Sequence, residues 1–174
     1  MLKKRGQIWI ETVIYTLIGL TIIAILLSMV VPKIDQMRDK SLMVQAITNL
    51  NHVDGLISEI MVTPGNSRQI DLSFNKGTYV FDALNGGIYY NLSDTKLFYS
   101  QLNQVVHQGE VDILTTSVGD KYFISAYLNY SSLNLTYNSQ NIPKTLSANP
   151  TGYKLVIENK GTTLGKTNIN IRSI

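Results

Sequence analysis

The chain has 174 residues, no cysteine, a formal net charge of +3 and only 16% charged residues, against roughly 25% in average soluble proteins. Lys3, Lys4 and Arg5 account for the whole net charge, so the rest of the chain is neutral and nucleic acid is not an expected partner. Without disulfides a packed core must stabilise the chain, and the length suits one domain beyond the N-terminal segment.

The N-terminal segment contains an apolar run from Ile8 to Val31 that is interrupted by one carboxylate, Glu11. A helix of about 24 residues is roughly 36 Å long, enough to cross the hydrocarbon core of a bilayer. We predict a transmembrane or filament-core helix over 7–31, with the preceding cations inside and the bulk of the chain outside. Glu11 then either requires a cationic partner or lies close enough to the headgroups to reach water.

The residues on either side of the apolar run indicate where a protease would act. The small-x-small site of an ordinary secretory signal is missing over residues 27–32. Before the run, Gly6 precedes Gln7, and a cut between them would remove residues 1–6 and keep the span. Such a cut would make 1–6 a leader peptide.

The leader and the start of the run resemble the class III signal peptides of archaeal type IV pilin-like proteins. The residues that carry the resemblance are Lys4, Arg5, Gly6, Gln7 and Glu11. It implies that a membrane prepilin peptidase cuts after Gly6, which makes Gln7 the mature N-terminus. It also implies that Glu11, then the fifth residue, pairs with the terminal amine of a neighbouring subunit. The chain departs from the family pattern at Trp9 and Tyr15, where Ser and Leu are common.

After Pro32 the spacing of apolar residues predicts an amphipathic helix over 32–62 that stops near Met61. The apolar positions are Ile34, Met37, Met43, Ile47, Leu50, Val53, Ile57 and Ile60. Pro32 is expected to kink one helix of about fifty residues, similar to the stem of type IV pilins. The alternative is a membrane helix joined to a separate helix that packs on its own domain.

Short β-rich runs fill residues 66–174, the predicted extracellular head domain, with one hint of a helical turn at Phe98–Gln108. The expected strands are Gln69–Phe74, Thr78–Ala83, Ile88–Leu92, Val111–Thr115, Tyr122–Tyr130, Leu133–Tyr137, Tyr153–Glu158 and Asn168–Arg172. Turns are expected at Asn75-Lys76-Gly77, Asn85-Gly86-Gly87, Gly119-Asp120 and Asn159-Lys160-Gly161. The predicted fold is α+β, a long helical stem followed by an antiparallel β-sandwich-like or curled sheet. We expect the residues after about Gln69 to fold without the stem, unless the apolar helix face belongs to their core.

Catalytic and cofactor-binding patterns are weak in this sequence. His52 and His107 are far apart and cysteine is absent, so no metal site is expected. No glycine-rich phosphate loop or nucleophile elbow occurs either. We therefore expect no enzyme activity and no cofactor.

Two further features allow more than one interpretation. The sequons at Asn91, Asn129 and Asn134 are candidate glycosylation sites, or unmodified residues of an Asn-rich chain. Six tyrosines could form a sugar- or surface-binding patch. We favour the alternative that most of them pack within the sheet as ordinary strand residues. They are Tyr89, Tyr90, Tyr122, Tyr127, Tyr130 and Tyr137.

The sequence therefore predicts a structural subunit of a type IV pilus-like archaeal surface filament, acting in adhesion or another surface interaction. Its expected partners are the prepilin peptidase, the membrane and identical or related subunits. The chain would be anchored in the membrane, with a cytoplasmic N-terminus, before it enters an extracellular filament. The alternative is a single-span, signal-anchored β domain that binds a ligand or serves a secretion apparatus without polymerising.

Overall fold

The computed structural model describes residues 3–174, with side chains from Trp9 onward. One helix, α1 (Lys3–Met61), is followed by eight strands, which confirms the predicted α+β class with a long N-terminal helix. The chain divides into two compact units between Arg38 and Asp39. The first unit is the exposed part of α1, and the second contains the remainder of α1 and all of the strands.

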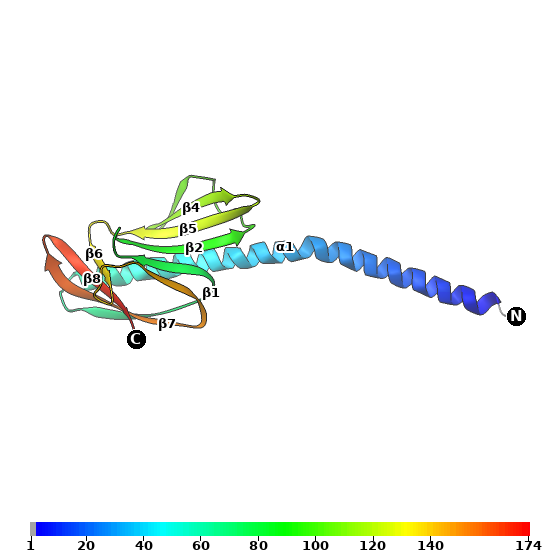
Figure 1. Ribbon diagram of the computed structural model, residues 1–174, viewed down its shortest axis with the longest axis horizontal. Coiled ribbons are helices and arrows are strands. Elements are labelled where there is room, and N and C mark those ends of the chain that lie inside the picture. The colour runs from blue at the N-terminus through cyan, green and yellow to red at the C-terminus, as the bar shows by residue number, and fades with distance from the viewer. Residues whose placement is uncertain (1–2) are drawn as a thin grey trace. The chain divides into compact units, whose positions relative to one another are not determined.

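The strands form one curled sheet rather than two separate sheets (Figure 1). They are β1 (Ser67–Asp82), β2 (Gly87–Thr95), β3 (Val105–Gln108), β4 (Val111–Val118), β5 (Lys121–Asn129), β6 (Asn134–Tyr137), β7 (Lys144–Thr163) and β8 (Lys166–Ser173). Their order across the sheet is β3-β4-β5-β2-β1-β7-β8-β6. All neighbouring strands are antiparallel except β6 and β8. These two pair in parallel, from Asn134 opposite Asn168 to Tyr137 opposite Ile171.

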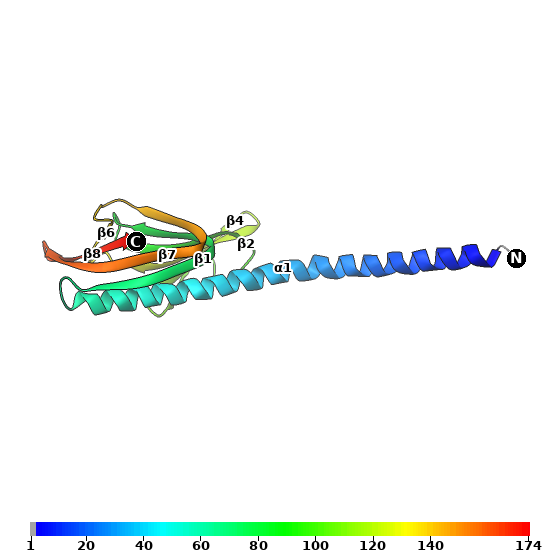
Figure 2. The same ribbon diagram turned by 90° about the horizontal axis from the view of Figure 1, so that it is seen from below.

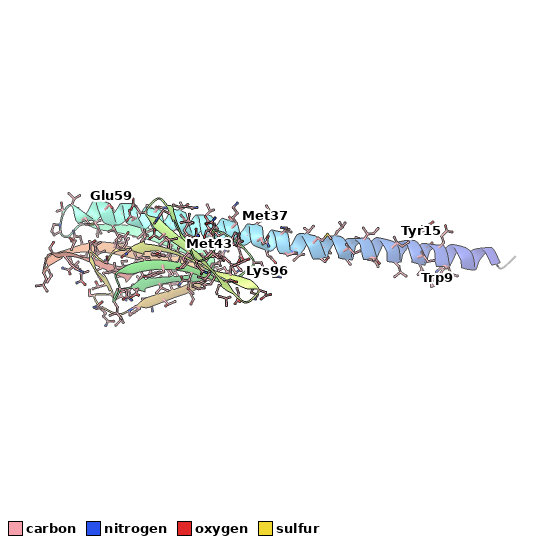
Figure 3. The ribbon with its side chains drawn as sticks, turned by 90° about the horizontal axis from the view of Figure 1, so that it is seen from above. Trp9, Tyr15, Met37, Met43, Glu59 and Lys96 are labelled. Carbon is pink, nitrogen blue, oxygen red and sulfur yellow. The ribbon has the colours of Figure 1, made fainter. Side chains whose placement is uncertain are left out.

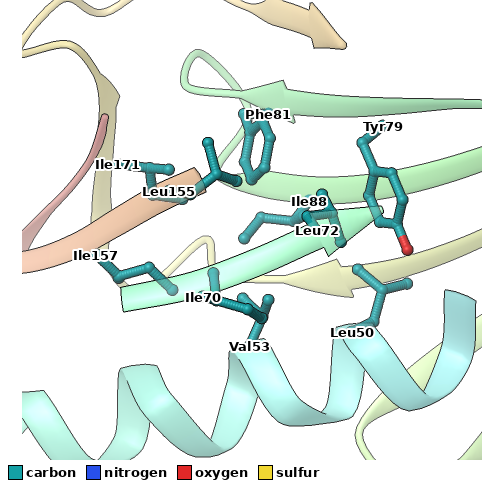
Figure 4. Close-up of a pocket in the computed structure, with 10 residues that line it drawn as sticks. All are labelled: Leu50, Val53, Ile70, Leu72, Tyr79, Phe81, Ile88, Leu155, Ile157 and Ile171. Atoms are coloured by element: carbon teal, nitrogen blue, oxygen red, sulfur yellow. The ribbon is translucent and has the colours of Figure 1, made fainter. Parts of the chain in front are cut away.

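The part of α1 that belongs to the second unit lies along one face of the sheet (Figures 2 and 3). Its buried side chains are Met43, Ala46, Ile47, Leu50, Val53, Leu56, Ile57 and Ile60. Figure 4 shows Leu50 and Val53 directed at the sheet residues Ile70 and Leu72. The cavity between them is only about 10 Å³, so helix and sheet are closely packed and form one core.

The helix is continuous through Pro32 and ends at Met61, as the sequence predicts. The expectation of one helical element is therefore met. However, residues 39–61 also pack on the chain's own sheet. This packing was expected of the alternative arrangement, in which a separate helix packs on its own domain. The residues after Gln69 share their core with this helix, so we now expect the folding unit to begin near Asp39.

Two predicted turns are irregularities inside long strands. Asn75-Lys76-Gly77 lies within β1, at a shift of register against β7. Gly77 has φ +81°, and a Cβ there would lie 2.6 Å from the carbonyl oxygen of Asn91. Asn159-Lys160-Gly161 is likewise a shift inside β7. Glycine provides the local conformation in both places without reversing the chain.

The reversal after β7 comes instead at Leu164-Gly165, where both residues have positive φ. This geometry is that of a two-residue hairpin turn, which usually carries Asn or Gly at its first central position. The helical turn expected at Phe98–Gln108 was wrong, because that segment is a loop followed by β3. The turns at Asn85-Gly86 and Gly119-Asp120 are confirmed between β1 and β2 and between β4 and β5.

A buried carboxylate fixes the start of the packed helix. Asp39, which is 6% exposed, accepts hydrogen bonds from Lys76 Nζ at 2.7 and 2.9 Å and from Thr95 Oγ1 at 2.5 Å. Thr95 Oγ1 accepts in turn from the backbone N–H of Leu97 at 2.9 Å. The network ties α1 to β1 and β2 at once. We call it the Asp39 clamp.

The shared core predicts where the chain can be shortened. Residues 39–174 should give a soluble domain that unfolds cooperatively, because all of its buried face is present. Residues 66–174 should aggregate or bind a hydrophobic dye, because deleting the helix exposes the apolar sheet face to water. Circular dichroism, dye binding and urea unfolding of the two fragments check this, and a well-folded 66–174 would contradict the assignment of one core.

The Asp39 clamp predicts an asymmetry between its partners. Lys76→Met leaves a buried carboxylate without its cation and should cost roughly 3 kcal/mol. Asp39→Asn keeps an acceptor for Thr95, and Lys76, 42% exposed, returns to water, so the cost should be roughly 1 kcal/mol. Urea unfolding of residues 39–174 measures both, with the exposed Lys96→Met as the matched control. Equal losses for the two variants would contradict the argument.

Candidate functional site

The exposed part of α1 is the most unusual surface of the described chain. Its apolar side chains face solvent along the whole run, including Trp9 at 74% and Leu20 at 58% exposed. Figure 3 shows Trp9 and Tyr15 projecting away from the helix. Among the described residues, α1 is the one helix long and apolar enough to cross a membrane. Such a surface is unfavourable in water and requires lipid or other apolar side chains around it.

Glu11 is the one acidic residue of this surface between Trp9 and Val31. Its Oε1 accepts a hydrogen bond from the hydroxyl of Tyr15, one helical turn later, at 3.4 Å. The bond is long, the carboxylate is exposed, and no lysine or arginine within residues 9–174 forms an ion pair with it. Tyr15 is one of the two residues that depart from the pilin-like pattern. It therefore provides a weak hydrogen-bond donor to Glu11, the glutamate of that pattern.

The predicted processing residues fall outside the side chains that the structure describes. They are Lys4, Arg5, Gly6 and Gln7. Their role, and the pairing of Gln7 with Glu11 of another copy, stay predictions.

The three sequons lie in different surroundings. Asn91 is half-buried in the central strand β2 and accepts from Ser125 Oγ at 2.8 Å. Asn134 is exposed, but its Nδ2 donates to Asn168 Oδ1 at 2.6 Å. Asn129 is exposed at the end of β5, and its bond to the N–H of Ser131 uses Oδ1. Glycosylation stays a prediction at all three.

The six tyrosines are divided between the core and the surface. Tyr90, Tyr130 and Tyr137 are buried in the core. Tyr90 donates to the carbonyl of Lys76 at 2.8 Å, and Tyr130 donates to Asp54 Oδ1 at 2.7 Å. Burial raises the pKa of Tyr130, and its bond to Asp54 adds to the effect. These residues support the interpretation as sheet packing.

Tyr89 and Tyr127 instead form a pair on the outer face of the sheet. They are cross-strand partners on β2 and β5, with ring centroids 5.6 Å apart and planes at 27°. The ring of Tyr89 lies over Gly87, where a Cβ would come within 2.5 Å of its Cε2. Glycine at this position therefore permits the flat placement of the ring. The outward direction follows from the buried neighbours Ile88 and Tyr90.

A carboxylate flanks the tyrosine pair on each side. Asp82 is the cross-strand partner of Gly87, and Asp112 is that of Tyr127. Burial raises the pKa of Tyr89, with a further contribution from the charge of Asp82. Burial also raises the pKa of Tyr127, and Asp112 adds to it. We call Asp82, Tyr89, Tyr127 and Asp112 the acidic tyrosine patch.

The two carboxylates of the patch are held by different partners. Asp82 accepts from the backbone N–H groups of Leu84 and Asn85 and, at 2.7 Å, from the Asn85 side chain. The side-chain bond from Asn85 is the largest cause that lowers the pKa of Asp82, so its charge persists at neutral pH. Asp112, with its side chain 27% exposed, contacts Nδ1 of His107 on β3. The sequence shows both carboxylates, but only the strand register places them beside the tyrosines.

Other cavities and clusters offer less chemistry. A groove of about 320 Å³ is lined by hydroxyls, amide groups and one lysine, without carboxylate or imidazole. Within residues 9–174, no group of three or more His, Asp or Glu is placed to hold a metal ion. The absence of enzyme activity remains a prediction.

The chain matches no protein-family model, no curated protein and no solved structure. Its function is therefore inferred from its own residues and geometry.

The buried tyrosines predict a loss of stability at alkaline pH. Burial, with a smaller effect from the charge of Asp39, raises the pKa of Tyr90 from 10.0 to about 12. The folded state thus holds this proton more tightly than the unfolded chain. The stabilisation is complete below about pH 10 and is lost as the pH rises towards about 12. Melting temperatures of residues 39–174 across this range, recorded with tyrosinate absorbance, check the sign, and a stability that rose with pH would contradict it.

Proposed function

We propose that this chain is a structural subunit of a type IV pilus-like surface filament, made as a membrane-anchored precursor and cut after Gly6 by a prepilin peptidase. In the filament the apolar stems bundle together, and the β domains are displayed outside. Its partners are the membrane before assembly and further copies of the same or a related chain after it. The displayed domains serve adhesion or another surface interaction.

The exposed apolar surface of α1 is the observation that carries this proposal. A single span would satisfy that surface with lipid, and a bundle of stems would satisfy it with neighbouring stems. Glu11 favours the bundle. An ionised carboxylate costs roughly 2.5–3.5 kcal/mol at the centre of a membrane helix, and less near an end, so it is rarely kept without a partner.

The hydrogen bond from Tyr15 does not replace such a partner. It donates one proton at 3.4 Å to one oxygen of Glu11 and adds no positive charge. A terminal amine at Gln7 of a neighbouring copy would offset the charge and supply further donors. The pairing would fix the register between stems more than it would add stability.

The alternative is a monomeric, single-span anchor whose β domain binds a ligand. The acidic tyrosine patch on the outer face of the sheet favours such a binding role. The two functions differ in their dependence on Glu11, since a lone anchor has no neighbouring amine to bind.

Replacing Glu11 by Gln tests the filament directly. The variant keeps the shape and hydrogen-bonding capacity of the side chain but removes its charge. We expect normal insertion and a normally folded β domain, with filament yield reduced at least about tenfold, the equivalent of 1.4 kcal/mol. Electron microscopy and blotting of sheared surface material, compared with the membrane fraction, measure this.

Thr16→Val is the matched control, because it removes from the same stem a hydroxyl that donates to the carbonyl of Thr12 at 2.8 Å. It should assemble normally. Mass spectrometry of the same material should find Gln7 at the N-terminus with a free amine. Wild-type filament yield from a correctly cut Glu11→Gln chain would contradict the intersubunit role, and a retained leader would contradict the processing step.

A further inference from the structure

The acidic tyrosine patch has the chemistry of a site for cationic side chains. The rings of Tyr89 and Tyr127 stack on each other on the outer face of the sheet, and a cation is attracted to the face of an aromatic ring. Guanidinium groups also stack on such rings and bind carboxylates through paired hydrogen bonds. The patch combines both kinds of acceptor across four strands: Tyr89, Tyr127 and Asp112 form one cross-strand row on β2, β5 and β4, and Asp82 on β1 lies two residues from that row, opposite Gly87.

The charged side chains of the patch are both carboxylates. Asp82 and Asp112 lie at its two ends, and His107 contacts Asp112 from β3. No lysine or arginine among the described residues forms an ion pair with Asp82 or Asp112. Burial raises the pKa values of the two tyrosines, and the charges of the same carboxylates add to this effect.

The spacing of the carboxylates defines what would fit them. Asp82 and Asp112 lie three strands apart and are offset by two residues along the strands. At 4.7–4.9 Å per strand and about 3.3 Å per residue, their Cα separation is roughly 16 Å. Two residues four positions apart in an extended peptide are separated by roughly 13 Å. An extended segment with arginines at positions i and i+4 would reach both carboxylates, because their long side chains span the remaining distance, while its central residues cross the tyrosine rings.

We propose that the outer face of the sheet binds an arginine-bearing segment of a partner protein through the acidic tyrosine patch. Asp82 and Asp112 each accept hydrogen bonds from one guanidinium, and Tyr89 and Tyr127 support the chain between them. This site does not depend on the filament, because it lies wholly within the β domain. Where copies assemble, the same weak site is repeated on every domain and the repeated contacts gain avidity.

The probe is the synthetic peptide Gly-Arg-Gly-Gly-Gly-Arg-Gly with capped ends, titrated into the full chain in detergent micelles. NMR of tyrosine-labelled protein should show saturable shifts of Tyr89 and Tyr127. A peptide with citrulline in place of both arginines has nearly the same shape without the charge, and it should bind at least about tenfold more weakly. A lysine peptide should bind between the two.

Protein variants separate this site from a general negative field. Asp112→Asn and Tyr127→Leu should each weaken arginine-peptide binding about five- to tenfold, since each removes one of the two interactions. Gly87→Ala should weaken it too, because the new Cβ displaces the ring of Tyr89. Asp120→Asn, in the exposed β4–β5 turn, is the matched loss of one charge away from the patch and should have no effect.

Circular dichroism of each variant establishes that it is folded, and Asp112→Asn alone suffices if a bulkier change fails to fold. Equal binding of the citrulline peptide would overturn the proposal, as would an equal loss from Asp120→Asn. So would the absence of saturable tyrosine shifts with the arginine peptide. None of these outcomes affects the Glu11 result, so the binding site and the filament are tested separately.

Discussion

An eight-stranded sheet with one apolar face must cover that face, and the rest of this structure depends on how the chain does so. The cover is a helix that precedes the sheet, through eight buried side chains between Met43 and Ile60. Because these residues come from α1, the β domain is incomplete without the last six turns or so of that helix. The exposed apolar run and the segment that completes the core therefore belong to one continuous element, α1.

Much of this fold follows from residue patterns. The spacing of Ile47, Leu50, Ile57 and Ile60 predicts the helix and its buried face, and Pro64-Gly65 correctly predicts its end. The patterns fail where contacts distant in sequence decide the structure. From the sequence Asp39 would be a solvated charge. It is nevertheless buried, because Lys76 on β1 and Thr95 on β2 donate hydrogen bonds to it. Gly77 is expected to form a turn, yet it permits a close approach of β1 to β2, and Leu164 carries no sign of the hairpin that it begins.

The two candidate sites also differ in how far the sequence predicts them. Glu11 can be recognised in the sequence, because it is a single carboxylate in a long apolar run. The donor from Tyr15 also follows from helical spacing, since residues four apart share a face. By contrast, the acidic tyrosine patch joins residues from β1, β2, β4 and β5, and no spacing along the chain brings them together. Its one local sign is Gly87, two residues before Tyr89, where a side chain would collide with the ring.

The Asp39 clamp also has a mechanical consequence. Asp39 is the first buried residue that follows the exposed run of α1, so a pull on the stem is transmitted to the domain first through its hydrogen bonds. Those bonds join the helix to β1 and β2 together, so the load is shared between two strands of the sheet interior and does not peel an edge strand away. A surface structure exposed to shear flow would gain from this arrangement, because the domain would resist tension along its anchor without the disulfide that a cysteine-free chain cannot form.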